Sequence, residues 1–128
     1  MSQMSDYLEN ALLNEVFRNV GYAPVATVYV ELYTATPNDA GGGTAVTGGS
    51  YARTAVTFGA ASAGSINNSV DVTFPTASAD WGTVTSFGVF DASSAGNLLV
   101  WGPLVSNKTV FNGDIFKFLA GQLVINFL

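Results

Sequence analysis

The residues of this chain that come nearest to a catalytic arrangement lie in ADWGTVTSFGVFDA, residues 79–92. Asp80 and Asp91 stand near its two ends, and Trp81 could stack on a sugar ring; glycoside hydrolysis requires such a pair of carboxylates. Each aspartate also borders a strand entry or a turn, where its side chain commonly accepts hydrogen bonds from the local backbone. We interpret the stretch as a strand between two aspartate-anchored turns. The residues expected to pack in the interior are Trp81, Phe87 and Val89.

Nucleophilic catalysis has less support still. The chain has no histidine and no cysteine, so the commonest general base and the thiolate nucleophile are both missing. A serine–lysine pair would have to use Lys108 or Lys117. The sequence predicts a turn at Lys108, whereas Lys117 lies between Phe116 and Phe118 and fits an exposed position of an alternating strand. We therefore expect no enzymatic activity.

The sequence lacks the patterns that are usual for metal and phosphate sites. Asp39, Asp71 and Asp114 are not clustered as in a calcium-binding loop. The glycine run at 41–43 is not part of a GxxxxGK[ST] motif, and no helix is predicted directly after it. We expect no cofactor and no metal.

The charge pattern limits the possible partners. The formal net charge is −5, and only 10% of the residues are charged, against about a quarter in an average soluble domain. The four basic residues, Arg18, Arg53, Lys108 and Lys117, are scattered, which disfavours nucleic acid and anionic membrane surfaces. No stretch resembles a signal peptide or a membrane span, so we expect assembly inside a cell. A mostly uncharged surface favours contact with other proteins.

A single helix is expected, over residues 5–19. Asp6 and Glu9 have the spacing of a capping box, Ser5 is a second candidate cap, and Gly21 is placed to end the helix. The apolar stripe at helical spacing either packs on its own domain or contacts a neighbouring subunit. This stripe comprises Leu8, Leu12 and Val16, with Phe17 and Val20 beside it.

After the helix the hydrophobic period changes to two, which predicts strands. The expected strands are 27–33, 51–58, 70–75, 83–91, 98–105, 109–111, 114–121 and 122–128, with loops at 34–50 and 59–69. Gly102-Pro103 is expected to break one strand, Gly88 hints at a bulge or a close backbone approach, and Asn112-Gly113 predicts a hairpin turn. We therefore predict one domain over residues 1–128, an antiparallel β-sandwich or jelly roll (26–128) preceded by one helix.

Two groups of apolar residues are candidate protein contacts. Strand alternation places Tyr29, Tyr33 and Tyr51 on the exposed side, next to Gly/Ser/Thr loops of the kind found at interfaces. The terminal LVINFL is apolar on both faces, with Ile125 and Phe127 on one of them, so it is either buried on both faces or packs on a neighbour.

Three phrases resemble a family of small structural proteins of tailed bacteriophages. They are SDYLENALLNEVFRN, VYVELYTATPNDAGGGTAVTGGSYARTAVTF and VDVTFPTASADWGTVTSFGVFDASSAGNLLVWGPL, and together they cover nearly the whole chain. Members usually carry DYLENxLLN, VYVALYT and WGTVTxFGIFDA, so Glu31 stands where alanine is common and Val89 where isoleucine is. The resemblance supplies no catalytic motif.

This resemblance implies a virion structural protein, placed in the virion after assembly in the host cytoplasm. The first expectation is a capsid cement (decoration) protein, a homotrimer that bridges major capsid subunits. The alternative is a tail-fibre or receptor-binding module that contacts host glycan or protein. The residues expected to make protein contacts are Leu8, Leu12, Val16, Phe17, Tyr29, Tyr33, Tyr51, Ile125 and Phe127.

Overall fold

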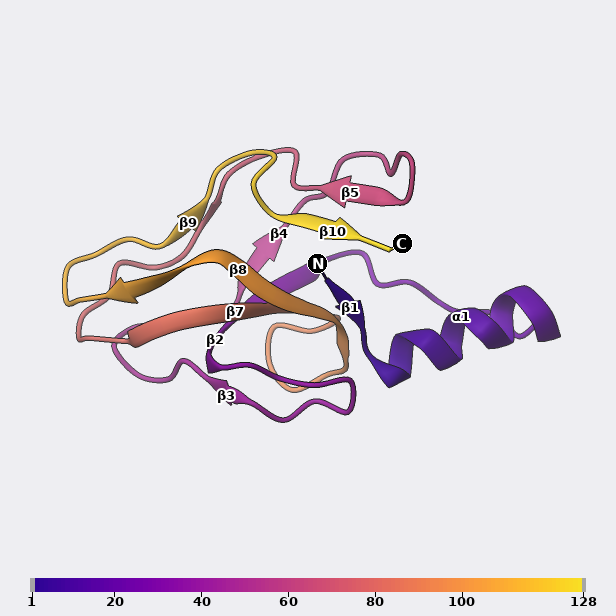
Figure 1. Cartoon of the computed structure of the whole chain (residues 1–128), viewed down its shortest axis with the longest axis horizontal. Helices are drawn as coiled ribbons and strands as arrows, with labels where there is room; N and C mark the ends of the chain where they lie inside the picture. Colours follow the sequence, from indigo (N-terminus) through magenta and orange to yellow (C-terminus); the bar gives the residue numbers. More distant parts are fainter. Residues whose placement is uncertain (1, 128) are drawn as a thin grey trace.

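A computed structural model describes residues 2–127 of the chain. It confirms the expected mainly β, antiparallel architecture with one leading helix, consistent with a β-sandwich (Figure 1). The β-strands form one body, and the helix extends away from it at one end.

The main sheet has six strands, all antiparallel to their neighbours. Its order is β1 (Gln3–Met4), β8 (Leu98–Val110), β7 (Gly82–Phe90), β2 (Val28–Ala35) and β3 (Thr44–Ala45), with β4 (Thr54–Val56) also paired to β2. β2 and β7 follow the alternating patterns that predicted them. β1 was not predicted, because two residues before a helix carry no period of their own.

Two short strand pairs lie along one side of the main sheet (Figure 1). They are β5 (Ser65–Asn67) with β10 (Val124–Asn126), and β6 (Val72–Thr73) with β9 (Lys117–Phe118). One hydrophobic core joins these pairs to the main sheet. Its most deeply buried side chains, all at most 2% exposed, include Val30, Leu32, Val72, Phe74, Val84 and Leu123.

Strand β8 does not break at Gly102-Pro103, so that prediction was wrong. The strand continues to Val110, and Lys108 lies within it rather than in a turn. The register with β7 nevertheless shifts, because Ser86 pairs with Pro103 while Val84 pairs with Lys108. The residues between 103 and 108 therefore bulge outward from the ladder.

The turn at Asn112-Gly113 is present, but it does not close a hairpin. Gly113 has φ 91°, and the Asp114 N–H donates to the Phe111 carbonyl at 2.9 Å. The strands on either side lie in different sheets, since β8 pairs with β7 whereas β9 pairs with β6. The turn carries the chain from one layer to the other.

Helix α1 spans Asp6–Arg18, within one residue of the prediction at each end. Ser5 is the N-cap, because its Oγ accepts the Leu8 N–H at 3.2 Å. Asn19, not Gly21, ends the helix: it has φ 55°, and its N–H bonds to the Asn14 carbonyl. Asparagine tolerates this left-handed conformation because its short polar side chain can bond to the local backbone. The helix can therefore end at Asn19, before the glycine that was predicted to end it.

Candidate protein-contact surfaces

The base of α1 is fixed to the β-body by buried polar contacts. Ser5 is 1% exposed; its N–H donates to the Leu99 carbonyl at 2.8 Å and its Oγ donates to the Leu98 carbonyl. The Asp6 N–H donates to the Asp39 carbonyl at 2.9 Å. Leu8, in the first turn, packs against the main core. The first turn of the helix is thus an anchor for the turns beyond it.

Beyond this anchor, the helix presents apolar side chains to solvent. No residue of α1 is buried. The exposed fractions are 55% for Leu13, 70% for Val16, 77% for Phe17 and 46% for Val20. Spacings of i, i+3 and i+4 place Leu13, Val16 and Phe17 on one face of α1, and Val20 follows directly after Asn19 ends the helix. Of the predicted stripe, Leu8 and Leu12 are partly buried, whereas Val16 and Phe17 belong to this exposed arm face (Leu13, Val16, Phe17 and Val20).

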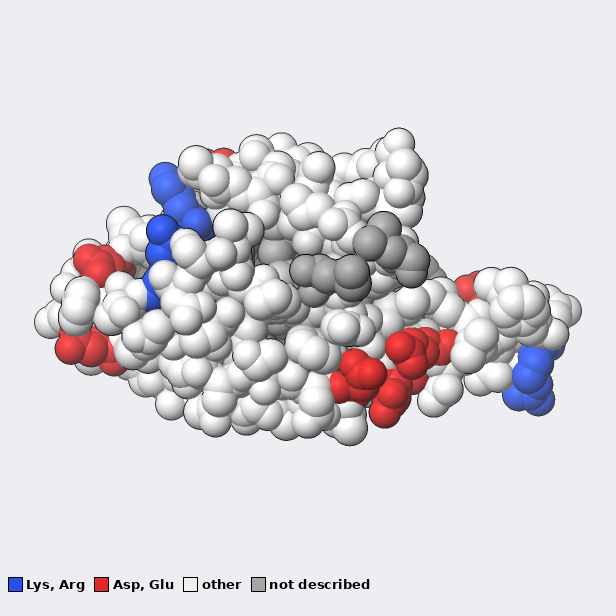
Figure 2. All heavy atoms as spheres, viewed as in Figure 1, with Lys and Arg blue, Asp and Glu red and all other residues white. Residues whose placement is uncertain are grey.

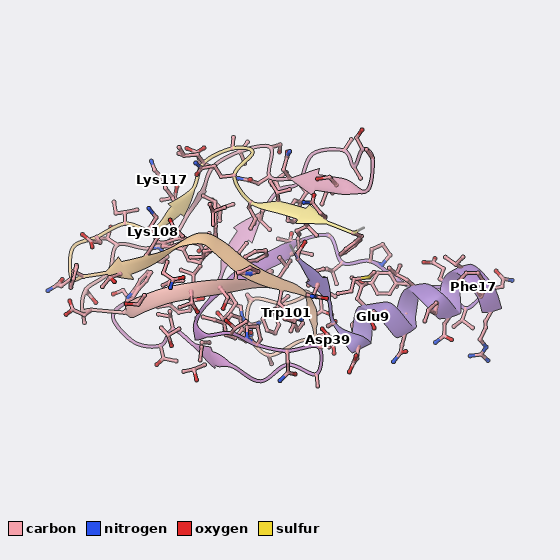
Figure 3. The ribbon with its side chains drawn as sticks, in the orientation of Figure 1. Glu9, Phe17, Asp39, Trp101, Lys108 and Lys117 are labelled. Atoms are coloured by element: carbon pink, nitrogen blue, oxygen red, sulfur yellow. The ribbon has the colours of Figure 1, made fainter. Side chains whose placement is uncertain are left out.

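A groove of about 940 Å³ runs along the second half of β8, opposite residues 114–126. Its apolar lining includes side chains that are largely exposed, with Val105 fully so and Ile115 at 57%. Lys108 and Lys117 line it together with Asp114; Figure 3 shows both lysines far from the helix. The bulge in β8 and the crossing between layers together create this surface. No pattern within one segment predicted this groove, because its two walls lie on separate segments.

The C-terminal strand contributes to both the core and the groove. Ile125 is 6% exposed and packs in the core, whereas Val124 lines the groove at 39%. Phe127 is 40% exposed. Of the two contact residues predicted here, only Phe127 is accessible, because Ile125 faces the main sheet.

The expected exposed tyrosine face is wrong for Tyr33, which is 3% exposed, and Tyr51 is half-buried. Tyr33 packs on Gly88 of β7: a Cβ at that glycine would lie 3.0 Å from the Tyr33 ring and 2.9 Å from Leu98. This is the close backbone approach that a glycine inside a strand suggests. Tyr29 is also half-buried.

Tyr51 instead belongs to the interior. Its ring stacks on Phe74 with centroids 6.1 Å apart and meets Trp81 edge-on at 5.2 Å. Its hydroxyl donates to Glu31 Oε2 at 2.5 Å and accepts the Leu32 N–H at 2.8 Å. The tyrosine hydroxyl therefore fills the gap on β2 between the residues paired with β4 and those paired with β3.

Glu31 is a buried carboxylate, 8% exposed, that also pairs with Arg53 at 3.4 Å. The Arg53 guanidinium lies 3.7 Å from the Phe90 ring centre and donates to the Ala92 and Ala95 carbonyls at 3.0 and 2.7 Å. It thereby ties the buried charge to the turn at 91–97. Burial, followed by the Glu31 hydrogen bond, raises the pKa of Tyr51, whereas burial and the charge of Glu31 raise the pKa of Tyr33 to about 12.

The two aspartates of the opening stretch are far apart. They flank β7, whose nine residues span roughly 30 Å at about 3.3 Å each, whereas glycosidase carboxylates lie within about 10 Å of each other. Asp80 Oδ1 accepts the Asn112 N–H at 2.8 Å. Slight burial opposes ionisation of Asp91, but hydrogen bonds from Asn97 outweigh it and lower the pKa of that carboxyl. Both act as turn anchors.

The aromatic side chains beside these aspartates are structural. Trp81 is 6% exposed, and its Nε1 donates to the Gly49 carbonyl at 2.9 Å, so it offers no stacking platform. Phe87 and Val89 are buried as predicted. Lys117 is exposed between two buried phenylalanines, which confirms its predicted alternation.

A second tryptophan, which the sequence reasoning passed over, lines an open recess of about 450 Å³ beside the helix base. Trp101 is half-buried, and its Nε1 donates to Asp39 Oδ1 at 2.9 Å (Figure 3). The recess is otherwise lined by Gln3, Asp6, Asn38 and Ala40. Within residues 2–127, no group of three His, Cys, Asp or Glu side chains is arranged to hold a metal. Over the same range, no helix is long and apolar enough to span a membrane.

The exposed helical arm and the weakly charged surface of the β-rich body are suited to contact with other proteins. The chain matches, over residues 3–126, the protein family described as podophage GP4 fiber I protein gp80. The chain belongs to this family. No curated protein matches it.

The family match confirms the expected resemblance to structural proteins of tailed phages. It is a match to a fiber family, and it gives no support to the expectation of a capsid cement protein in particular. A virion location and association with other virion proteins follow from the same match.

Proposed function

We propose that this chain is a fibre component of a short-tailed phage virion and that it acts by binding other virion proteins, without catalysis. The observation that carries the proposal is the match to a podophage fiber family over residues 3–126. This favours the tail-fibre alternative over capsid cement.

The structure supports a binding role in physical terms. The arm face exposes three apolar side chains on a helix that is anchored at its first turn and a fourth, Val20, just beyond the helix end, and such exposed patches mark interaction sites. The visible surface carries few charges (Figure 2), which lowers the cost of desolvating it in an interface. The buried Glu31–Arg53 pair and the continuous core supply a rigid support for these contacts.

The proposal is tested by separating purified particles into head and tail fractions and quantifying this chain by mass spectrometry. A fibre component is expected in the tail fraction, in low and fixed stoichiometry. A cement protein would follow the major capsid protein into the head fraction in many copies. Presence in the head fraction alone would therefore overturn the fibre proposal.

A receptor-contacting role is a second candidate, and the Trp101 recess favours it. Indole rings beside carboxylate and amide groups can stack on a sugar and bond its hydroxyls. Titration of the purified chain with host-surface glycan, followed by tryptophan fluorescence, is expected to show a change that Trp101→Phe removes. Trp81 is buried and serves as the internal reference. An unchanged signal at saturating glycan would refute this role.

A further inference from the structure

We propose that the arm face of α1 docks into the β8 groove of a second copy of this chain, in a head-to-tail contact. The arm face is Leu13, Val16, Phe17 and Val20, and the groove is the apolar trough along Pro103–Val110 and residues 114–126. This inference concerns self-association and does not depend on where the protein sits in the particle.

Both surfaces are apolar and unpartnered within residues 2–127. Phe17 is 77% exposed on the helix, and Val105 and Ile115 are exposed in the groove. Covering such side chains in an interface is favourable in free energy, because it removes apolar area from water. The two surfaces are therefore complementary in character, and neither is satisfied by the chain itself.

The groove is long enough for the exposed part of the arm. Because the base of α1 is held against the β-body, only Leu13–Arg18 can dock, and these six residues span about 9 Å at 1.5 Å each. The β8 wall of the groove spans at most roughly 25 Å between Pro103 and Val110. The groove volume of about 940 Å³ is enough for a row of several side chains. The exposed turns of one helix therefore fit within one groove.

Charge complementarity identifies the occupant as this helix. Glu9 lies one turn before Leu13 on the arm face, and α1 carries three acids, Asp6, Glu9 and Glu15, against Arg18 alone. The groove carries Lys108 and Lys117 against Asp114, whose Oδ2 is engaged by the Phe111 N–H at 2.9 Å. An acidic helix thus meets a basic groove in a chain that has only four basic residues.

Geometry excludes docking within one copy. Figure 3 shows Phe17 and the two groove lysines at opposite ends of the molecule, and Ser5 and Leu8 hold the base of the helix in place. Arm and groove can therefore meet only between copies. Because the two surfaces differ, the contact is heterologous, and repeated contacts close into a ring if the rotation between copies allows it.

The experiment uses the natural absence of cysteine. One preparation of the full chain carries Phe17→Cys, a second carries Val105→Cys, and the two are mixed and treated with a short bismaleimide. Cross-linked dimers are expected in the mixture and not in either preparation alone, as read by intact mass. Ser94→Cys, at an exposed turn position, is the matched control and should not cross-link to Phe17→Cys.

Sedimentation of cysteine-free protein gives a second readout. Phe17→Asp is expected to weaken association at least about tenfold with an unchanged circular dichroism spectrum. Lys108→Glu with Lys117→Glu should weaken it too, and adding Glu9→Lys should restore part of the loss. Phe17→Cys cross-linking only to itself would overturn the proposal in favour of helix–helix pairing. A chain that stays monomeric and uncross-linked at every concentration would overturn it as well.

Discussion

Replacing Tyr51 with phenylalanine tests whether the interior depends on the hydroxyl that joins Glu31 to β2. The ring would keep its packing on Phe74 and Trp81, so no cavity forms. What is lost is one acceptor for the Leu32 N–H, in a residue that is 0% exposed, and one donor to a buried carboxylate.

The size of the effect follows from these two bonds. A buried N–H left without a partner costs about 1–3 kcal/mol, and a hydrogen bond to a charged group contributes about 1.5–3 kcal/mol. We expect Tyr51→Phe to lower the free energy of unfolding by about 3 kcal/mol. This is a large share of the 5–15 kcal/mol typical of a domain.

Urea unfolding followed by tryptophan fluorescence and circular dichroism measures this change. The midpoint should fall at an unchanged m-value, because the surface exposed on unfolding is the same. Tyr29→Phe, on the same strand, is the control: its hydroxyl makes no hydrogen bond within residues 2–127, so the cost should stay within about 0.5 kcal/mol. A double-mutant cycle of Tyr51→Phe with Glu31→Ala should give a coupling of about 1–2 kcal/mol. A cost for Tyr51→Phe no greater than the control would refute this reasoning.

Three further predictions concern other contacts. The pKa of Tyr33 is raised from 10.0 to about 12, so its contribution to stability is complete below pH 10 and is lost as the pH rises toward 12. The chain has five tyrosines, so the tyrosinate absorbance of Tyr33 is read as the difference between wild type and Tyr33→Phe; it should appear above pH 10 together with loss of β-sheet circular dichroism. An unchanged alkaline midpoint in Tyr33→Phe would contradict this. Ser5→Ala removes the N-cap and should lower the free energy of unfolding by about 1–2 kcal/mol. Amide hydrogen exchange should become faster across residues 6–18, and equal protection in mutant and wild type would show that the cap does not hold the arm. In Arg53, Nη1 donates to both turn carbonyls while Nε pairs with Glu31, and the single ammonium of a lysine cannot serve the carbonyls and the carboxylate together. We therefore expect Arg53→Lys to lower the free energy of unfolding by about 1–2 kcal/mol and to speed proteolysis at the 91–97 turn, and the prediction fails if cleavage there is unchanged.

The parts of the fold that could be predicted are those set by local patterns. The alternation at 27–33 and 83–91 fixed β2 and β7, and the apolar spacing within 5–19 fixed the helix. The same alternation placed Lys117 outward between two phenylalanines. In each case the period of the side chains is enough to decide the element.

The parts that could not be predicted depend on distant segments. The alternation on β2 predicted that Tyr33 is exposed, but the missing side chain at Gly88 of β7 leaves room for the Tyr33 ring to pack against that strand. Pro103 predicted the end of a strand, yet β8 continues beyond it and still pairs with β7 after a register shift. The groove needs both β8 and residues 114–126, which the turn at Asn112-Gly113 separates into different layers. No pattern within a single segment could reveal these three features.

The central claim is that this chain functions in the virion by contact with other proteins, and an asymmetric cryo-electron microscopy reconstruction of the phage particle tests it most directly. We expect density fitted by this β-body on the tail, in contact with another protein chain along the helical arm or the groove. Particles that are complete and infectious, with no copy of this chain anywhere on head or tail, would contradict the claim.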